Sequence, residues 1–146
     1  MANTQSWAKS HPTGAREIDS TNECLQFVLA ELFQNSLPCR GDAVSCRKLG
    51  DLERFLVRKF AREEELMATA DFHGLAAHRS DHAILLARLA TMRRELVCGA
   101  YDPDMVHAFL TDWAVGHVGS FDSEFGKFLA WRREKPEGRR KIGTLS

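Results

Sequence analysis

Four segments of the sequence carry apolar residues at the three- and four-residue spacing of an amphipathic helix. They cover roughly residues 19–37, 44–71, 75–98 and 102–117, and short connections separate them. No stretch alternates polar and apolar residues as a half-buried strand would. Amphipathic helices joined by short connections pack antiparallel around a common core. The sequence therefore predicts an all-α fold, an antiparallel up-down-up-down four-helix bundle with an irregular N-terminal arm.

The chain is expected to form a single domain over residues 1–146, a length that can bury a core of its own. Residues 1–17 contain Pro12, Gly14 and several small polar residues, and they should form the arm, with Trp7 docked on the bundle. Residues from about 18 to 122 would form the bundle, and residues 123–146 a C-terminal extension that carries a basic run.

The charge balance disfavours several functional classes. Lys and Arg number 20, Asp and Glu number 20, and the formal net charge is zero, so no overall field favours nucleic acid or a membrane surface. No apolar run reaches the roughly 20 residues of a membrane span, and the N-terminal residues lack a hydrophobic targeting core. We therefore expect a cytoplasmic protein with no nucleic-acid or membrane partner.

The cysteines do not form a metal-binding pattern. Because none of them lies in a C-x-x-C pair, a cysteine zinc site is disfavoured. Cys39 and Cys46 flank a predicted loop and could pair, although free thiols are expected in a reducing cytosol. The four cysteines are Cys24, Cys39, Cys46 and Cys98.

Polar residues interrupt the predicted core faces at one end of the bundle. The second helix carries Lys59 and Glu63 late in its stripe, the third carries His78 and His82 early, and the fourth ends at His117. In an antiparallel bundle these positions share one end. Burying such groups is costly unless a cation lies between them. Mixed nitrogen and oxygen donors predict a metal site that suits Fe(II), with Zn(II) or Mn(II) also possible.

Two further residues extend this cluster. Asn22 interrupts the first stripe at the same end. Gly119 and Ser120 weaken the fourth helix beyond His117, and a turn there would bring Asp122 back toward the core. Other polar residues near these positions are expected to be exposed, namely Glu64, Glu65, His73 and His107.

The ordered motifs resemble the hemerythrin family from about Trp7 to Asp122. They read IDSTNECLQF (18–27), KFAREEELM (59–67), HRSDH (78–82) and HVGSFD (117–122). The resemblance implies a four-helix bundle that in typical members holds two non-haem irons bridged by a Glu and an Asp. It implies that one iron takes three histidines and both bridging carboxylates, matching His78, His82, His117, Glu63 and Asp122.

The sequence departs from the family at the other iron, the one that binds dioxygen. Where the family pattern has a His from the first helix and a His from the second, this chain has Asn22 and Lys59. An amide oxygen replaces imidazole poorly, and a protonated lysine cannot be a ligand. We expect one metal rather than two. Lys59 would then form an internal ion pair with the carboxylates, and Asn22 would support the site without ligating.

The resulting hypothesis is a hemerythrin-like protein with a mononuclear metal centre, iron preferred. It would bind or sense a small molecule such as O2, NO or peroxide, and no catalytic residue is assigned, so a binding protein is favoured over an enzyme. Two alternatives stay open: a conventional two-iron oxygen-binding hemerythrin and a metal-free four-helix interaction module. Metal content separates the three, at about one, two or zero ions per chain.

Overall fold

The computed structural model describes residues 6–35, 46–97 and 99–134, and every regular element within these ranges is helical. The predicted all-α class is confirmed. The elements are α1 (Trp7–Ser10), α2 (Arg16–Phe33), α3 (Arg47–Thr69), α4 (Leu75–Glu95), α5 (Pro103–His117), a π-helical turn (Val118–Asp122) and α6 (Ser123–Glu134).

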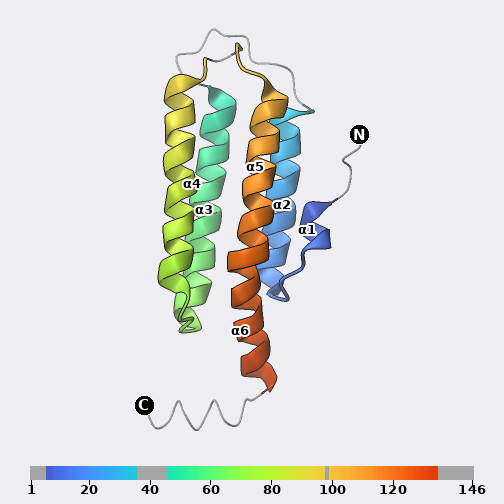
Figure 1. The fold of residues 1–146 in the computed structure, drawn as a ribbon, viewed down its shortest axis with the longest axis vertical. Coiled ribbons are helices and arrows are strands. Elements are labelled where there is room, and N and C mark those ends of the chain that lie inside the picture. Colours follow the sequence, from blue (N-terminus) through green and yellow to red (C-terminus); the bar gives the residue numbers. More distant parts are fainter. Residues whose placement is uncertain (1–5, 36–45, 98, 135–146) are drawn as a thin grey trace.

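The four long helices α2, α3, α4 and α5 lie side by side (Figure 1). Their colour gradients show that consecutive helices run in opposite directions, so that α2 and α4 run up the view while α3 and α5 run down. The short helix α1 lies beside α2, and α6 continues α5 beyond the lower end of the bundle. Among the described helices, none has the length and apolar character that crossing a bilayer requires.

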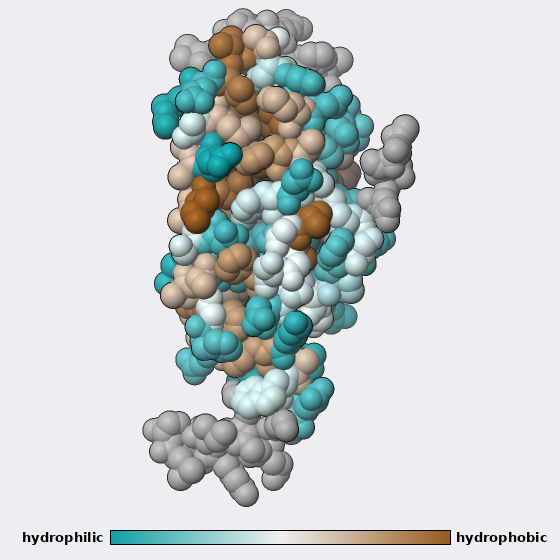
Figure 2. Space-filling model, viewed as in Figure 1, coloured by the Kyte–Doolittle hydropathy of each residue, from teal (hydrophilic) through white to brown (hydrophobic). Residues whose placement is uncertain are grey.

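The interior is divided into two apolar clusters. The larger one includes Leu29, Leu56, Leu89 and Leu110. The smaller one contains Ala15, Ile18, Met67, Phe72 and Phe125. On the face shown in Figure 2, hydrophobic residues gather mainly over the upper half, while hydrophilic side chains cover much of the rest.

A buried polar layer separates the two apolar clusters. Polar residues lie between the two clusters along the helices; in α2, for example, Asn22 lies between Ile18 and Leu25. The layer consists of Asn22, Lys59, Glu63, His78, His82, His117 and Asp122, all nearly inaccessible to solvent. The polar residues that interrupt the predicted core faces therefore lie together at one level of the bundle.

Helix α2 begins at Arg16, a few residues before the predicted start near Asp19 or Ser20. Asp19 instead reaches back into the N-terminal arm. Its Oδ1 accepts hydrogen bonds from the Thr13 backbone N–H (2.8 Å) and the Thr13 hydroxyl (2.7 Å), and its Oδ2 accepts one from Gly14 N–H (3.1 Å). The arm is therefore more regular than predicted. It contains α1, and Trp7 packs on the core as expected.

The prediction that the fourth helix is interrupted near Gly119 and Ser120 is wrong. The chain remains helical from Pro103 to Glu134, with the π-helical turn between α5 and α6. A π-helix bonds residues five apart, so its wider turn aligns residues with that separation on one face. His117 and Asp122 are five residues apart, and both are buried in the polar layer. A local change of helix type, rather than a break, brings Asp122 inward.

The contact between α6 and the arm provides a test of this packing. A Cβ atom on Gly126 would overlap the carbonyl oxygen of Thr13, whereas nothing lies within 4 Å of a Cβ on Gly116. We expect Gly126→Ala to lower the free energy of unfolding by about 1–3 kcal/mol, because backbone must move to relieve the overlap. Gly116→Ala, in exposed α5 surface, should raise it by roughly 0.5–1 kcal/mol through helix propensity. Urea denaturation measures both, and equal effects of the two substitutions would contradict the close packing of the arm.

Candidate metal centre

Four elements supply the histidines and carboxylates at the centre of the polar layer. His78 and His82 are one turn apart on α4, and Glu63 faces them from α3. His117 ends α5, and Asp122 ends the π-helical turn. The side chains of all five are at most 2 % exposed, so each gives up nearly all of its hydration. Unless they satisfy one another or a bound ion, that loss destabilises the fold.

The Nε2 atoms of the histidines converge on the two carboxylates. Asp122 Oδ1 lies 3.0 Å from His78 Nε2 and 3.1 Å from His117 Nε2. Glu63 Oε1 lies 3.2 Å from His82 Nε2 and 3.7 Å from His78 Nε2. One donor atom from each of Glu63 and the three histidines falls within 4.8 Å of all the others. This grouping is compact enough for a single ion to contact every member.

The second oxygen of each carboxylate is bound by the protein itself. The Lys59 ammonium forms an ion pair with Glu63 Oε2, and the Lys59 side chain is only 3 % exposed. Asn22 Nδ2 donates a hydrogen bond to Asp122 Oδ2 over 3.2 Å. The two residues at which the sequence departs from the family pattern therefore bind the two carboxylates that the resemblance names as bridges.

Two carboxylates outside the cluster orient the imidazole rings. Glu64 Oε2 lies 2.8 Å from His82 Nδ1, and Asp81 Oδ2 lies 2.7 Å from His117 Nδ1. Each carboxylate favours a proton on Nδ1, which leaves the lone pair of Nε2 directed into the cluster. The prediction that Glu64 is solvated is therefore wrong, because its side chain is 20 % exposed and bound to His82.

Sequence reasoning missed Asp81 and misassigned Glu64, although both adjoin predicted ligands. Glu64 directly follows Glu63, and Asp81 directly precedes His82. Carboxylates beside metal-binding histidines are common partners of the ring nitrogen that faces away from the metal. Glu65, by contrast, is exposed as expected and pairs with Arg62.

Aromatic rings enclose the histidines. Phe60 stacks on His82 with ring centroids 3.8 Å apart and an interplanar angle of 4°. Trp113 stacks on His117 at 4.5 Å, and Phe121 stacks on the same imidazole at 5.3 Å. These contacts restrict ring rotation and keep water from the cluster, which strengthens the electrostatic interactions inside it.

The cluster holds its carboxylates ionised. Burial alone raises the pKa of Glu63, but Lys59 and the neighbouring histidines outweigh burial and lower it to about 2. The pKa of Asp122 is likewise lowered against the effect of burial, chiefly by His117 and His78. Burial lowers the pKa of His78, but Asp122 and Glu63 outweigh it and raise that pKa to about 9. The site thus attracts positive charge, which protons and Lys59 supply in part.

Unsatisfied atoms test whether a metal fits. Glu63 Oε1, His82 Nε2 and Asp122 Oδ1 are buried and make no hydrogen bond, and all three are directed into the cluster. Each can donate an electron pair, and a buried polar atom without a partner costs roughly 1–3 kcal/mol. A cation among them would satisfy all three at once. The residues present therefore fit a metal ion held by imidazole nitrogens and carboxylate oxygens.

The remaining candidate residues lie outside this cluster. His73 is exposed as predicted, whereas His107 is half-buried and burial lowers its pKa. Cys24 is exposed, and Cys46 is buried with its Sγ 2.9 Å from Tyr101 Oη. The question of a Cys39–Cys46 pair lies outside the described residues, because Cys39 is not among them.

Sequence comparisons identify relatives over much of the chain. It is 29% identical to a myohemerythrin of Riftia pachyptila over 119 residues, 82% of this chain and 88% of the relative. It is 31% identical to a hemerythrin chain of Sipunculus nudus over 78 residues, which are 53% of this chain and 60% of that protein. A bacteriohemerythrin of Stenotrophomonas maltophilia (strain R551-3) is 30% identical over 71 residues, 49% of this chain and 46% of the relative. No family model and no solved structure matches significantly.

These relatives agree with the motifs and with the buried cluster of histidines and glutamate that can hold a metal. Hemerythrin relatives of both animal and bacterial origin match this chain, at 27–31% identity. These similarities support the hemerythrin family for this chain.

Proposed function

We propose that this protein is a hemerythrin-like binding protein with one metal ion, iron preferred, in the buried polar layer. The ligands would be the Nε2 atoms of His78, His82 and His117 together with Glu63 Oε1 and Asp122 Oδ1. Zn(II) and Mn(II) suit the same donor types.

One observation carries this proposal: each carboxylate has one oxygen bound by the protein and one oxygen left without a hydrogen bond. Lys59 binds Glu63 Oε2, and Asn22 binds Asp122 Oδ2. The free oxygens, Glu63 Oε1 and Asp122 Oδ1, are both directed toward the histidines. A bridged pair of metals needs both oxygens of each carboxylate, whereas a single metal needs only one.

Electrostatics supports the same choice. A second cation next to Glu63 Oε2 would lie close to the Lys59 ammonium, and two like charges in a buried site repel strongly. A site with no metal would depend on a proton on His78 to compensate the carboxylates, and His82 Nε2 would still be buried without a hydrogen bond. One divalent metal together with Lys59 would satisfy the donors and more than offset the charge of the two carboxylates.

The donor set also suggests a function. Three nitrogens and two oxygens would leave one position of a six-coordinate ion open, and a bound iron there would supply a binding site for a small molecule such as O2, NO or peroxide. The rings of Phe60, Trp113 and Phe121 keep bulk water away, while Lys59 holds a positive charge beside the site.

Metal content tests the number of ions directly. We expect elemental analysis of iron-reconstituted wild-type protein to give about one ion per chain. The double variant Asn22→His/Lys59→His should bind about two, because it removes the competing ammonium and adds two imidazoles. Asn22→His alone is the matched control and should remain near one, since Lys59 is still present. Two ions in wild type would support a conventional two-iron protein, none would support an interaction module, and one in the double variant would refute the assignment of Lys59.

The carboxylate behind His117 provides a second test. Asp81→Asn should weaken metal binding by roughly 10–100-fold, because it replaces the charged acceptor that keeps the proton on His117 Nδ1 with a neutral amide that can also donate. Asp112→Asn is the control, since Asp112 is an exposed carboxylate on the same helix as His117 and lies outside the cluster. Competition with a chromogenic chelator measures both affinities. Equal affinities for the two variants would show that Asp81 does not position the ring.

Proton release gives a third test, independent of mutation. In the metal-free protein the raised pKa of His78, about 9, means that its ring is protonated at neutral pH. A metal must displace that proton, so binding at about pH 8 should release about one proton from His78, and the release should fall toward zero well above pH 9. Calorimetric titration in two buffers of different ionisation enthalpy measures the release. A value that does not decrease at high pH would contradict ligation by His78.

A further inference from the structure

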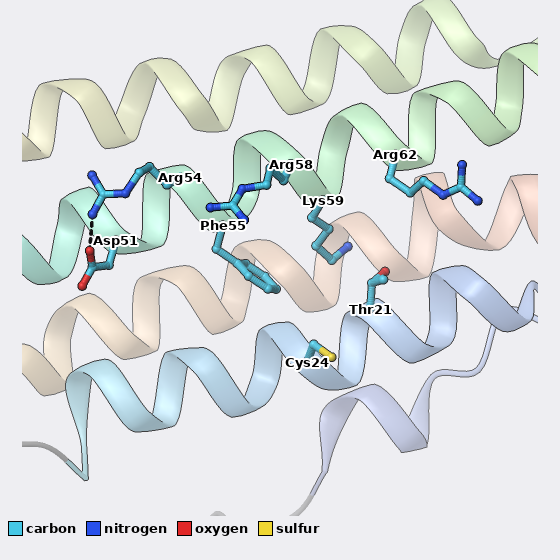
Figure 3. A pocket seen from close by; sticks show the side chains of 8 residues that line it. All are labelled: Thr21, Cys24, Asp51, Arg54, Phe55, Arg58, Lys59 and Arg62. Atoms are coloured by element: carbon cyan, nitrogen blue, oxygen red, sulfur yellow. Dashed lines mark hydrogen bonds and ion pairs between the residues drawn. The ribbon is translucent and has the colours of Figure 1, made fainter.

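A second site candidate is an open pocket of about 460 Å³ between α2 and α3 (Figure 3). Four cationic side chains of α3 line it, and they are Arg54, Arg58, Lys59 and Arg62. Thr21 and Cys24 of α2 lie across from them. Lys59 is the one residue of the buried polar layer that also lines this pocket.

Helical spacing gathers the guanidinium groups. Arg54, Arg58 and Arg62 are four residues apart, so they follow one stripe along α3. Two of them already have carboxylate partners: Arg54 pairs with Asp51, and Arg62 pairs with Glu17 and Glu65.

Arg58 differs from its two neighbours on the stripe. It forms no ion pair or hydrogen bond with any residue in the described part of the chain, and it is exposed at the middle of the stripe. A guanidinium presents several N–H donors in a fixed plane, which matches the geometry of a carboxylate or a phosphate. Arg58 is therefore available to bind an anionic group in the pocket.

Lys59 adds a buried positive charge at the inner side. Its side chain extends from α3 toward Thr21 on α2 and is only 3 % exposed (Figure 3). Arg58, whose side chain points toward Arg54 in the same view, is exposed. An anion bound by Arg58 would thus meet one exposed positive charge and lie near a second, buried one.

The size and the apolar part of the lining limit the kind of anion. Phe55 contributes its ring next to Arg58, and the methylene stems of the arginines are also apolar. A volume of about 460 Å³ lies in the range of small organic ligand sites and exceeds what one inorganic ion needs. We propose that this pocket binds a small organic anion whose carboxylate or phosphate group is held by Arg58, with the buried charge of Lys59 nearby, and whose apolar part packs on Phe55.

The test uses fluorobenzoate as probe and fluorobenzamide as its neutral counterpart, followed by fluorine NMR on the full chain at low ionic strength. Wild-type protein should bind fluorobenzoate in the millimolar range and the amide at least about tenfold more weakly, as loss of a charge-assisted hydrogen bond predicts. Arg58→Gln should reduce binding of fluorobenzoate by at least about tenfold. Cys24→Trp, at an exposed helical position that borders the pocket, should block it by filling space.

Arg94→Gln is the matched control, because it removes one positive charge from the exposed surface of α4 away from the pocket. It should leave binding unchanged. Equal losses in Arg94→Gln and Arg58→Gln would show diffuse attraction by net charge and would overturn the proposal. Equal affinity for the neutral amide, or no binding of fluorobenzoate, would also overturn it. Because metal content is measured separately, either failure leaves the metal proposal untouched, and failure of the metal proposal leaves the pocket untouched.

Discussion

The buried ion pair between Lys59 and Glu63 is the interaction on which the polar layer depends. Removing two charged groups from water costs several kcal/mol per ion, and their mutual attraction repays this only when the remaining donors and acceptors are also satisfied. Here Lys59 binds only one oxygen of Glu63, while the other is directed at the histidines without a hydrogen bond. The pair thus satisfies Oε2 of Glu63 and leaves Oε1 available to a cation.

The surrounding structure holds this layer in place. The apolar clusters above and below it keep the four long helices in register, so that polar residues from different helices meet at one level. Stacked aromatic rings then fix two imidazoles from one side, and Glu64 and Asp81 fix them from the other. Because the rings are oriented before any ion arrives, little conformational freedom remains to be lost on binding.

Lys59 also connects the interior with the surface. Its ammonium lies in the polar layer, while its side chain lines the pocket between α2 and α3. Lys59 thereby brings a positive charge both to the carboxylate of Glu63 and to the inner wall of a surface pocket. The neighbouring Arg58 extends that positive charge outward to solvent.

The sequence by itself determined the all-α class, the helices α2 to α5 to within about four residues, and the inward positions of the polar residues, because each follows from the local period of an α-helix. It did not predict that the chain stays helical beyond His117 through α6. Only the tertiary structure decided which oxygen of Glu63 and of Asp122 faces the histidines, since this depends on Lys59 and Asn22 approaching from α3 and α2. The same holds for Asp81, which meets His117 from 36 residues away, and for the π-helical turn that brings Asp122 inward. Periodicity assigns a residue to a face, but contacts between helices assign each atom its partner.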